Sequence, residues 1–127
     1  MTFKGQPIST TQAPITRAKI SDGKSVTLKV PGGETVIAQQ FYLINDFFGV
    51  AMQSGSEGEE IVLQIEQAEY ETDNINTGEA FALGEKIYWD ELGKKFTTTA
   101  ASNRLVGRVA SPKDSNNVIW FILLPQQ

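Results

Sequence analysis

The chain has 127 residues, a formal net charge of −4 at pH 7, 40% hydrophobic residues, and neither cysteine nor histidine. This length fits one domain with a modest core. The lack of cysteine and histidine excludes thiol catalysis, the serine–histidine triad, disulfide stapling and nearly every zinc or copper site. No cofactor or metal is therefore expected. The acidic balance disfavours nucleic acid as a partner, because a phosphate-binding surface needs clustered lysine and arginine.

Charge is distributed unevenly along the chain. Residues 1–33 carry five bases against one acid, residues 34–85 carry eleven acids and no base, and residues 86–127 carry six bases against three acids. One interpretation is that strands from the three regions interleave and mix their charges over one surface. The other is that a basic segment of one subunit lies on the acidic middle of a neighbour, or that a basic partner binds there.

Residues 1–20 have the composition of an extended arm. Pro7 and Pro14 prevent a long helix and favour extended backbone. The segment is either a frayed terminus or an arm that becomes ordered by lying across a partner. In the second case its apolar side chains, which are too widely spaced to form a core, and one base are candidate partner contacts: Phe3, Ile8, Ile15 and Arg17.

Residues 21–127 are predicted to form a single β-domain. Val26, Leu28 and Val30 alternate with polar residues, which is typical of a half-buried strand. Further apolar runs between polar or glycine-rich turns predict strands over residues 36–44, 47–52, 61–65, 87–89, 96–99, 105–109 and 118–124. The three strands within residues 84–109 are expected to form a meander.

The predicted fold is an all-β barrel or sandwich of roughly seven to nine strands, with the extended N-terminal arm in front of it. The last strand, residues 118–124, is apolar on both faces and is expected to lie centrally in its sheet. Eight apolar residues are predicted to form most of the core: Val26, Leu28, Ile61, Leu63, Ile87, Val106, Ile119 and Phe121.

Two segments of the chain resemble one another. FFGVAMQSGSEGEEIVLQI at 47–65 aligns without a gap with LVGRVASPKDSNNVIWFIL at 105–123, which places Gly49 on Gly107. Gly-Glu pairs precede both segments, at residues 33–34 and 84–85. The likeness either reflects what any two hairpins share, or it indicates two β-units packed about a pseudo-twofold axis, with each glycine allowing a bulge or close strand approach.

Few residues suggest chemistry. Asp73, Asn74, Asn76 and Glu79 could be imagined as calcium ligands, but Ile75 breaks the spacing of an EF-hand loop. The acids of the tract 54–60 are explained by a solvated turn, and no glycine stands in a P-loop frame.

Tyr88 and Trp89 are adjacent residues of one predicted strand. Their side chains therefore point to opposite faces, one into the core and one to the surface. Trp89 is a candidate partner contact, although the sequence alone leaves open which of the two faces outward.

The segment GEKIYWDELGKKFTTTAASNRLVGRVA resembles the bacteriophage capsid cement family. The similarity lies in a Gly-x-x-[IV]-Tyr-Trp-Asp element at 84–90, an Asn-x-x-[IV]-Gly element at 103–107, and a GVA sequence followed by an acidic strand at 49–63. It covers about residues 24–124, and the first 20 residues depart from the family pattern. The resemblance implies a small all-β protein without enzymatic activity that decorates a phage head and braces the major capsid subunits.

The resemblance also sets the expected partners and location. The expected partners are the major capsid protein and further copies of the chain, with a trimer favoured because a head lattice offers threefold positions. No membrane partner is expected, since no apolar run approaches the roughly 20 residues of a spanning helix. The N-terminus lacks the apolar region of a secretory signal, so synthesis in the host cytoplasm is predicted. The resemblance implies a place on the virion, at the surface of the phage head. The alternative is a non-catalytic barrel module that binds carbohydrate or peptide on a virion.

Overall fold

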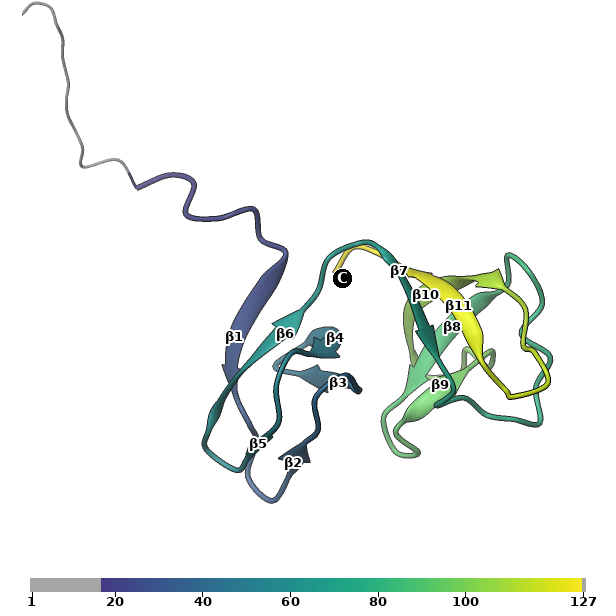
Figure 1. Cartoon of the computed structure of the whole chain (residues 1–127), viewed down its shortest axis with the longest axis horizontal. Coiled ribbons are helices and arrows are strands. Elements are labelled where there is room, and N and C mark those ends of the chain that lie inside the picture. The colour runs from purple at the N-terminus through teal and green to yellow at the C-terminus, as the bar shows by residue number, and fades with distance from the viewer. Residues whose placement is uncertain (1–16, 127) are drawn as a thin grey trace, which may run out of the picture.

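Alternating apolar side chains fold into strands over most of residues 17–126, the part of the chain that the computed structural model describes (Figure 1). Within this part there are eleven strands and no helix, which confirms the predicted all-β class. The strands are β1 (Ser25–Lys29), β2 (Thr35–Val36), β3 (Phe41–Ile44), β4 (Phe47–Ala51), β5 (Gly55–Ser56), β6 (Glu60–Gln64), β7 (Glu69–Thr72), β8 (Lys86–Asp90), β9 (Lys95–Thr97), β10 (Arg104–Ser111) and β11 (Ile119–Leu123).

Pairing between these strands is antiparallel and makes three sheets. The strand orders are β1-β6-β4-β3, β7-β11-β10-β8-β9 and β2-β5. The two large sheets are open, so no closed barrel forms. Figure 1 shows the sheet of β1, β3, β4 and β6 on the left and the sheet of β7 to β11 on the right.

Both large sheets contain the same arrangement of four strands. We call residues 24–65 unit 1, with β1, β3, β4 and β6, and residues 68–123 unit 2, with β7, β8, β10 and β11. In each unit the first strand pairs with the fourth, the fourth with the third, and the third with the second. The registers agree with the sequence alignment, since the pair Val50–Gln64 of unit 1 corresponds to the pair Arg108–Ile122 of unit 2. The predicted repeat is therefore present in the strand pairing.

Two glycines occupy matching positions in these units. A methyl group on Gly49 would lie 2.1 Å from the carbonyl oxygen of Gln64, and one on Gly107 would lie 2.7 Å from that of Ile122. Gln64 and Ile122 are themselves equivalent. Each glycine thus permits the close strand approach that the sequence alignment suggested.

The alignment of the two Gly-Glu pairs is wrong. The Gly84 amide donates to the Val109 carbonyl at 2.8 Å, and the Val109 amide donates to the Glu85 carbonyl at 2.9 Å. The residues that make the same two bonds in unit 1, with Ala51 as partner, are Gln39–Gln40 and not Gly33–Glu34. Gln39 has a φ of 72° and Gly84 one of 82°. The repeated feature is this backbone geometry, which glutamine adopts here despite its side chain.

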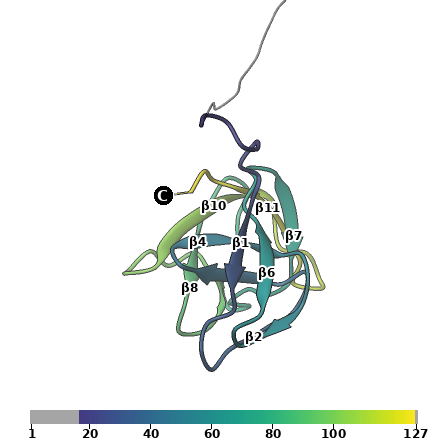
Figure 2. The same ribbon diagram turned by 90° about the vertical axis from the view of Figure 1, so that its left-hand side faces the viewer.

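The units pack head to tail and not about a pseudo-twofold axis. Each unit has a front face and a back face. The front face carries Ile61 and Leu63 in unit 1, and Ile119 and Phe121 in unit 2. The back face is the opposite side of the sheet. The front of unit 1 forms one core cluster, which the β2-β5 sheet completes through Val36. The front of unit 2 forms the other cluster together with back-face residues of unit 1, namely Phe41, Leu43, Phe48 and Val50. Figure 2, viewed from the unit 1 side, shows β1 in front of β10 and β11.

Most of the predicted core is confirmed. Six of the eight residues are buried, while Val26 and Leu28 are half-buried because β1 is the edge strand of its sheet. The expected meander is wrong, since β10 pairs with β8 and not with β9. The other edge of β9 is occupied by residues 74–76, where the amide of Phe96 donates to the carbonyl of Asn74 and its carbonyl accepts from the amide of Asn76.

The interleaving interpretation of the charge pattern holds for the strands. Basic β1 pairs with acidic β6, so Lys29 lies opposite Glu60, and the Lys24 ammonium lies 3.6 Å from the Glu66 carboxylate. Acidic β7 lies in the same sheet as basic β10. Opposite charges from distant parts of the sequence therefore meet within one molecule.

Candidate interaction surface

The residues that the sequence singled out as partner contacts do not form one surface within the described part of the chain. Phe3, Ile8 and Ile15 lie outside the described residues. Arg17 is exposed ahead of the first strand.

Trp89 requires a correction. It is 2% exposed and packs its ring against Phe48 and Phe96, at centroid distances of 5.0 and 5.2 Å. Its indole Nε1 donates to Glu91 Oε1 at 2.7 Å, which satisfies the one polar atom of the ring. Tyr88 is the half-exposed member of the pair. The aromatic pair thus contributes Trp89 to the core and not to an open surface.

An open apolar surface with two neighbouring exposed side chains lies instead on β11. Strand alternation turns Ile119, Phe121 and Leu123 inward, where they are fully buried. Trp120 and Ile122 point the other way and are 49% and 42% exposed. The prediction that this strand is central is confirmed, since β7 and β10 pair with it on both sides. However, only one of its two apolar faces is buried.

The register of the neighbouring strands places charge on both sides of these residues. Ile122 is paired with Glu69 of β7 and Arg108 of β10, and Arg108 is paired in turn with Lys86 of β8. Trp120 is paired with Glu71 and Ser111. Paired residues point to the same side of an antiparallel sheet. We call this surface the outer face. It consists of an acidic column on β7 (Glu69 and Glu71), an apolar column on β11 (Trp120 and Ile122), and a basic column made of Arg108 on β10 and Lys86 on β8.

The outer face is the back face of unit 2. The equivalent back face of unit 1 is covered, so the two can be compared residue by residue. Phe41 and Val50 of unit 1 are equivalent to Lys86 and Arg108 by register, and both are buried against unit 2. In unit 2 the two positions carry bases and remain exposed. The repeat therefore leaves one equivalent face open, with a tryptophan and an isoleucine on it.

A hollow adjoins the acidic side of the outer face. It has a volume of about 230 Å³ and is lined by Glu69, Tyr70, Glu71 and Trp120. The hydroxyl of Tyr70 donates to the carbonyl of Glu66 at 2.8 Å. Burial of this residue, followed by the charge of Glu66, raises the pKa of its phenol. Tyr70 is therefore a neutral hydrogen-bonded wall of the hollow at neutral pH.

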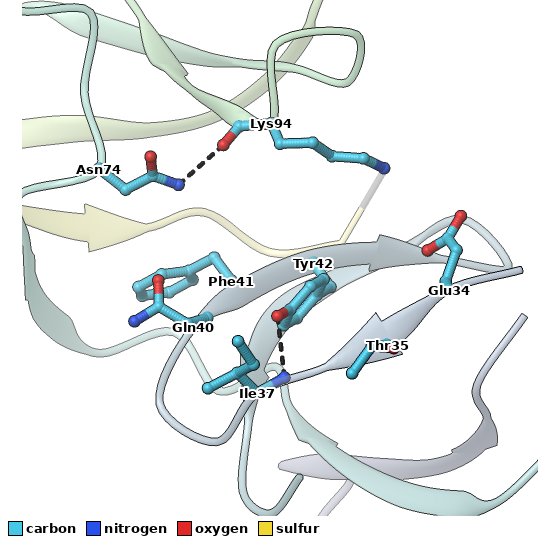
Figure 3. Close-up of a pocket in the computed structure, with 8 residues that line it drawn as sticks. All are labelled: Glu34, Thr35, Ile37, Gln40, Phe41, Tyr42, Asn74 and Lys94. Atoms are coloured by element: carbon cyan, nitrogen blue, oxygen red, sulfur yellow. Dashed lines mark hydrogen bonds between the residues drawn. The ribbon is translucent and has the colours of Figure 1, made fainter. Parts of the chain in front are cut away.

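A second concave region lies between the two units (Figure 3). This cleft has a volume of about 440 Å³, with Ile37, Phe41 and Tyr42 as its apolar lining and Glu34 and Lys94 as charged residues. The Tyr42 hydroxyl accepts a hydrogen bond from the Ile37 amide at 2.9 Å. Figure 3 shows the Lys94 side chain extending across from the unit 2 side. The cleft has the size and lining to take an extended peptide or a few side chains.

The residues considered for calcium do not converge. The Asn74 side-chain amide donates to the Lys94 carbonyl. The Glu79 carboxylate accepts from the Thr98 amide at 2.7 Å and from the hydroxyls of Thr97 and Thr99 at 2.9 Å. Within residues 17–126 no group of three or more acidic side chains is placed to hold a metal ion.

The Glu79 contacts instead fasten the β7–β8 connection to β9. Partial desolvation raises the pKa of Glu79, but the hydrogen bonds from Thr98, Thr97 and Thr99 outweigh it, and the net pKa lies below its ordinary value. Lys113 holds the same loop from the other side, since its ammonium donates to the carbonyls of Thr77 and Glu79. The cluster is a structural clamp.

No helix in residues 17–126 is long and apolar enough to cross a membrane.

An all-β chain with an open apolar strand face between columns of opposite charge has the features of a protein that acts by binding another protein surface. More specifically, the chain belongs to the phage cement protein family, whose model matches residues 20–126. Membership confirms the resemblance seen in the sequence and gives the chain a structural, capsid-associated role on the phage virion. No curated protein and no solved structure gives a significant match.

Proposed function

We propose that this protein binds the major capsid protein on the outside of an assembled phage head and stabilises the shell, without enzymatic activity. The observation that carries the proposal is the family match over residues 20–126, which spans both units. A rigid two-unit β-domain suits this role, because a brace between capsomers must hold its shape under load. Synthesis in the host cytoplasm followed by addition to a completed head is the corresponding assembly order.

The working form on the shell is proposed to be a homo-oligomer, and a trimer is favoured. A head lattice offers positions where three capsid subunits meet, and a trimer would match their symmetry. Three linked footholds can raise overall affinity by about 10²–10⁴ without any single contact being strong. This gain suits a small domain with a limited contact surface.

The experiment is titration of purified empty heads of the cognate phage with the protein, followed by sedimentation. We expect binding to saturate at a fixed number of copies per head, and decorated heads to resist heat or low salt better than bare ones. Heads of an unrelated phage serve as the control. Binding that never saturates, or that is equal on both kinds of head, would contradict the proposal.

Residues 1–20 are proposed to act as an arm that contacts the shell or a neighbour, ahead of a β-domain formed by residues 21–127. The family match covers residues 20–126, and its lack of the first 19 residues supports treating them as a separate segment. Deletion of residues 2–20 removes three bases and the side chains of Phe3, Ile8, Ile15 and Ile20. We expect unchanged unfolding but weaker head binding, and a larger loss at low salt, where charges reach about 30 Å. Equal binding by the truncated and full-length chains would reduce the segment to a terminus without function.

The second candidate function is peptide or carbohydrate binding on a virion, and the cleft between the units favours it. Its apolar lining of Ile37, Phe41 and Tyr42 is the kind of surface on which a peptide segment or a sugar ring packs. Ile37→Ser removes an exposed apolar side chain from the cleft without entering the core. Head binding that falls with this variant would locate the contact in the cleft, whereas unchanged binding would argue against the candidate.

A further inference from the structure

We propose that the outer face of unit 2 pairs with the outer face of a second copy of this chain. The two copies would be related by a twofold axis that lies between the two faces and is parallel to β11. The contact would be isologous, meaning that the same surface is used by both copies. It goes beyond shell binding, since it concerns what neighbouring copies do to one another.

The first argument is that the outer face is incomplete as it stands. Trp120 and Ile122 lie two residues apart on one strand and are about half exposed, although the three remaining side chains of β11 are buried. The equivalent face of unit 1 is covered within the chain by unit 2. Among residues 17–126 no further element is free to cover unit 2, since the front of unit 1 is already occupied by its own cluster.

The second argument is charge geometry. Neighbouring strands are about 4.8 Å apart, so the acidic column on β7 and the first base of the basic column, on β10, lie at equal distances on either side of β11. Rotation by 180° about an axis along β11 places β7 of one copy opposite β10 of the other. Glu69 then faces Arg108 of the second copy, and the symmetry supplies this pair twice.

The alternative face-to-face orientation is disfavoured by the same charges. A twofold axis across the strands, midway between residues 120 and 122, would keep each strand opposite its own copy, so that Glu69 of each copy would meet Glu71 of the other and Arg108 would have no acid opposite it. Like charges at such distances are destabilising. The outer face is thus complementary to itself in one orientation and repulsive in the other.

The apolar column would supply the centre of the contact. With the axis along β11, Trp120 of one copy meets Trp120 of the other, and Ile122 meets Ile122. Packed sheets lie about 10 Å apart, which leaves room for two tryptophan rings to overlap. An aromatic centre within a charged rim is the usual anatomy of a protein interface. A second copy presents acid and base at the required spacing by necessity, whereas a shell protein would have to match it independently.

A twofold contact combines with the proposed trimer in a specific way, and this step rests on the proposed function. Threefold positions on a head lattice neighbour one another across local twofold positions. Trimers whose subunits pair through their outer faces would be linked across those twofolds into a continuous net. The proposed cementing would then act through contacts between copies as well as contacts with the shell.

The test is a charge exchange in the full-length chain, read by analytical ultracentrifugation over a concentration series. We expect Glu69→Arg and Arg108→Glu each to weaken self-association by about tenfold or more, because each turns two attractive pairs into repulsive ones. The double variant should restore association to near the original level. Glu60→Arg and Lys29→Glu, exposed strand residues of unit 1, are the matched controls and should change nothing.

A second measurement uses the absence of cysteine from the sequence. A single Ile122→Cys variant should give a covalent dimer with a short thiol-reactive crosslinker, since the two thiols would lie near the axis. A Leu92→Cys variant, at a site that is 99% exposed in the β8–β9 turn, should give none under the same conditions.

Failure of the charge-exchanged double variant to recover, or equal crosslinking at residues 92 and 122, would overturn the proposal. Loss of head binding by Trp120→Ala with unchanged self-association would also overturn it, because the face would then belong to the shell. Self-association through this face without any binding to heads would leave the inference standing and contradict the proposed function instead.

Discussion

A methyl group placed on Gly49 would lie 2.1 Å from the carbonyl oxygen of Gln64, so close that the backbone would have to shift. Glycines of this kind are the positions where an added side-chain atom disturbs the backbone most. The same is true in milder form of Gly107, where the distance to the Ile122 carbonyl oxygen is 2.7 Å. In both cases the obstacle is backbone, which moves only if a strand pair opens.

We therefore expect Gly49→Ala to destabilise the protein by about 1–3 kcal/mol or more, and Gly107→Ala to cost less. Gly32→Ala is the matched control, since a methyl group there would meet nothing within 4 Å and the backbone imposes no positive φ. Urea unfolding of the three variants measures the differences. An equal cost at residues 32 and 49 would show that the close strand approach is not what requires glycine.

Glu79 is the residue whose charge the fold uses most directly. Its pKa in the folded state lies below the ordinary value of a glutamate carboxyl, so its ionised form stabilises the fold above that ordinary pKa, and the contribution disappears as the pH falls through the folded pKa. We expect Glu79→Gln to lower stability at pH 7 and the difference from wild type to shrink below pH 4.5. Glu60→Gln, on an exposed strand position, is the control and should leave stability at pH 7 nearly unchanged. Thermal unfolding from pH 7 down to pH 3 measures both.

At the scale of one strand, β11 shows which structural features the sequence predicts and which it does not. Its apolar residues on both faces predict a central strand, and its position between β7 and β10 confirms this. Periodicity alone cannot distinguish an apolar residue in the core from one on an open face, because both have the same hydropathy. For this reason the sequence does not single out the surface around Trp120, while Trp89, a candidate partner contact by sequence, is buried in the core.

The alternation along β11 makes a direct prediction. Ile119→Ala and Phe121→Ala remove fully buried side chains and should cost about 2–5 kcal/mol. Ile122→Ala and Trp120→Ala on the open face should stay within roughly 1 kcal/mol for the monomer. Chemical denaturation at low protein concentration separates the two classes. Similar costs on both faces would mean that the outer face is covered in the free protein.

At the scale of the whole molecule, the repeat was visible in the sequence but its packing was not. The alignment of Gly49 with Gly107 led to the correct equivalence of strands, since identical backbone requirements leave similar residues. A pseudo-twofold, one of the two interpretations of the repeat, would join the units through like faces. What decides the packing is a difference between the units: the back face of unit 1 carries Phe41 and Val50, whereas that of unit 2 carries Lys86 and Arg108. Only the first can be buried against a core.

This head-to-tail packing predicts that the two units unfold together. The larger core cluster draws Phe41 and Phe48 from unit 1 and Trp89, Phe96 and Phe121 from unit 2, with Phe41 and Phe48 each 5.2 to 5.7 Å from the ring centre of Phe96. Unit 2 without unit 1 would expose its front face to water. Calorimetry of the full chain should therefore show one transition whose van't Hoff and calorimetric enthalpies agree.

The same coupling can be tested from both sides of the contact. Phe41→Ala in unit 1 and Phe121→Ala in unit 2 should each lower the midpoint of that single transition, by several degrees for a domain of this size. Leu63→Ala, in the other cluster, should lower it too, because the front of unit 1 supports the strands that carry Phe41 on their back. Two resolved transitions, with Leu63→Ala moving one and Phe121→Ala the other, would mean that the units are independent domains and that the shared aromatic cluster does not join them.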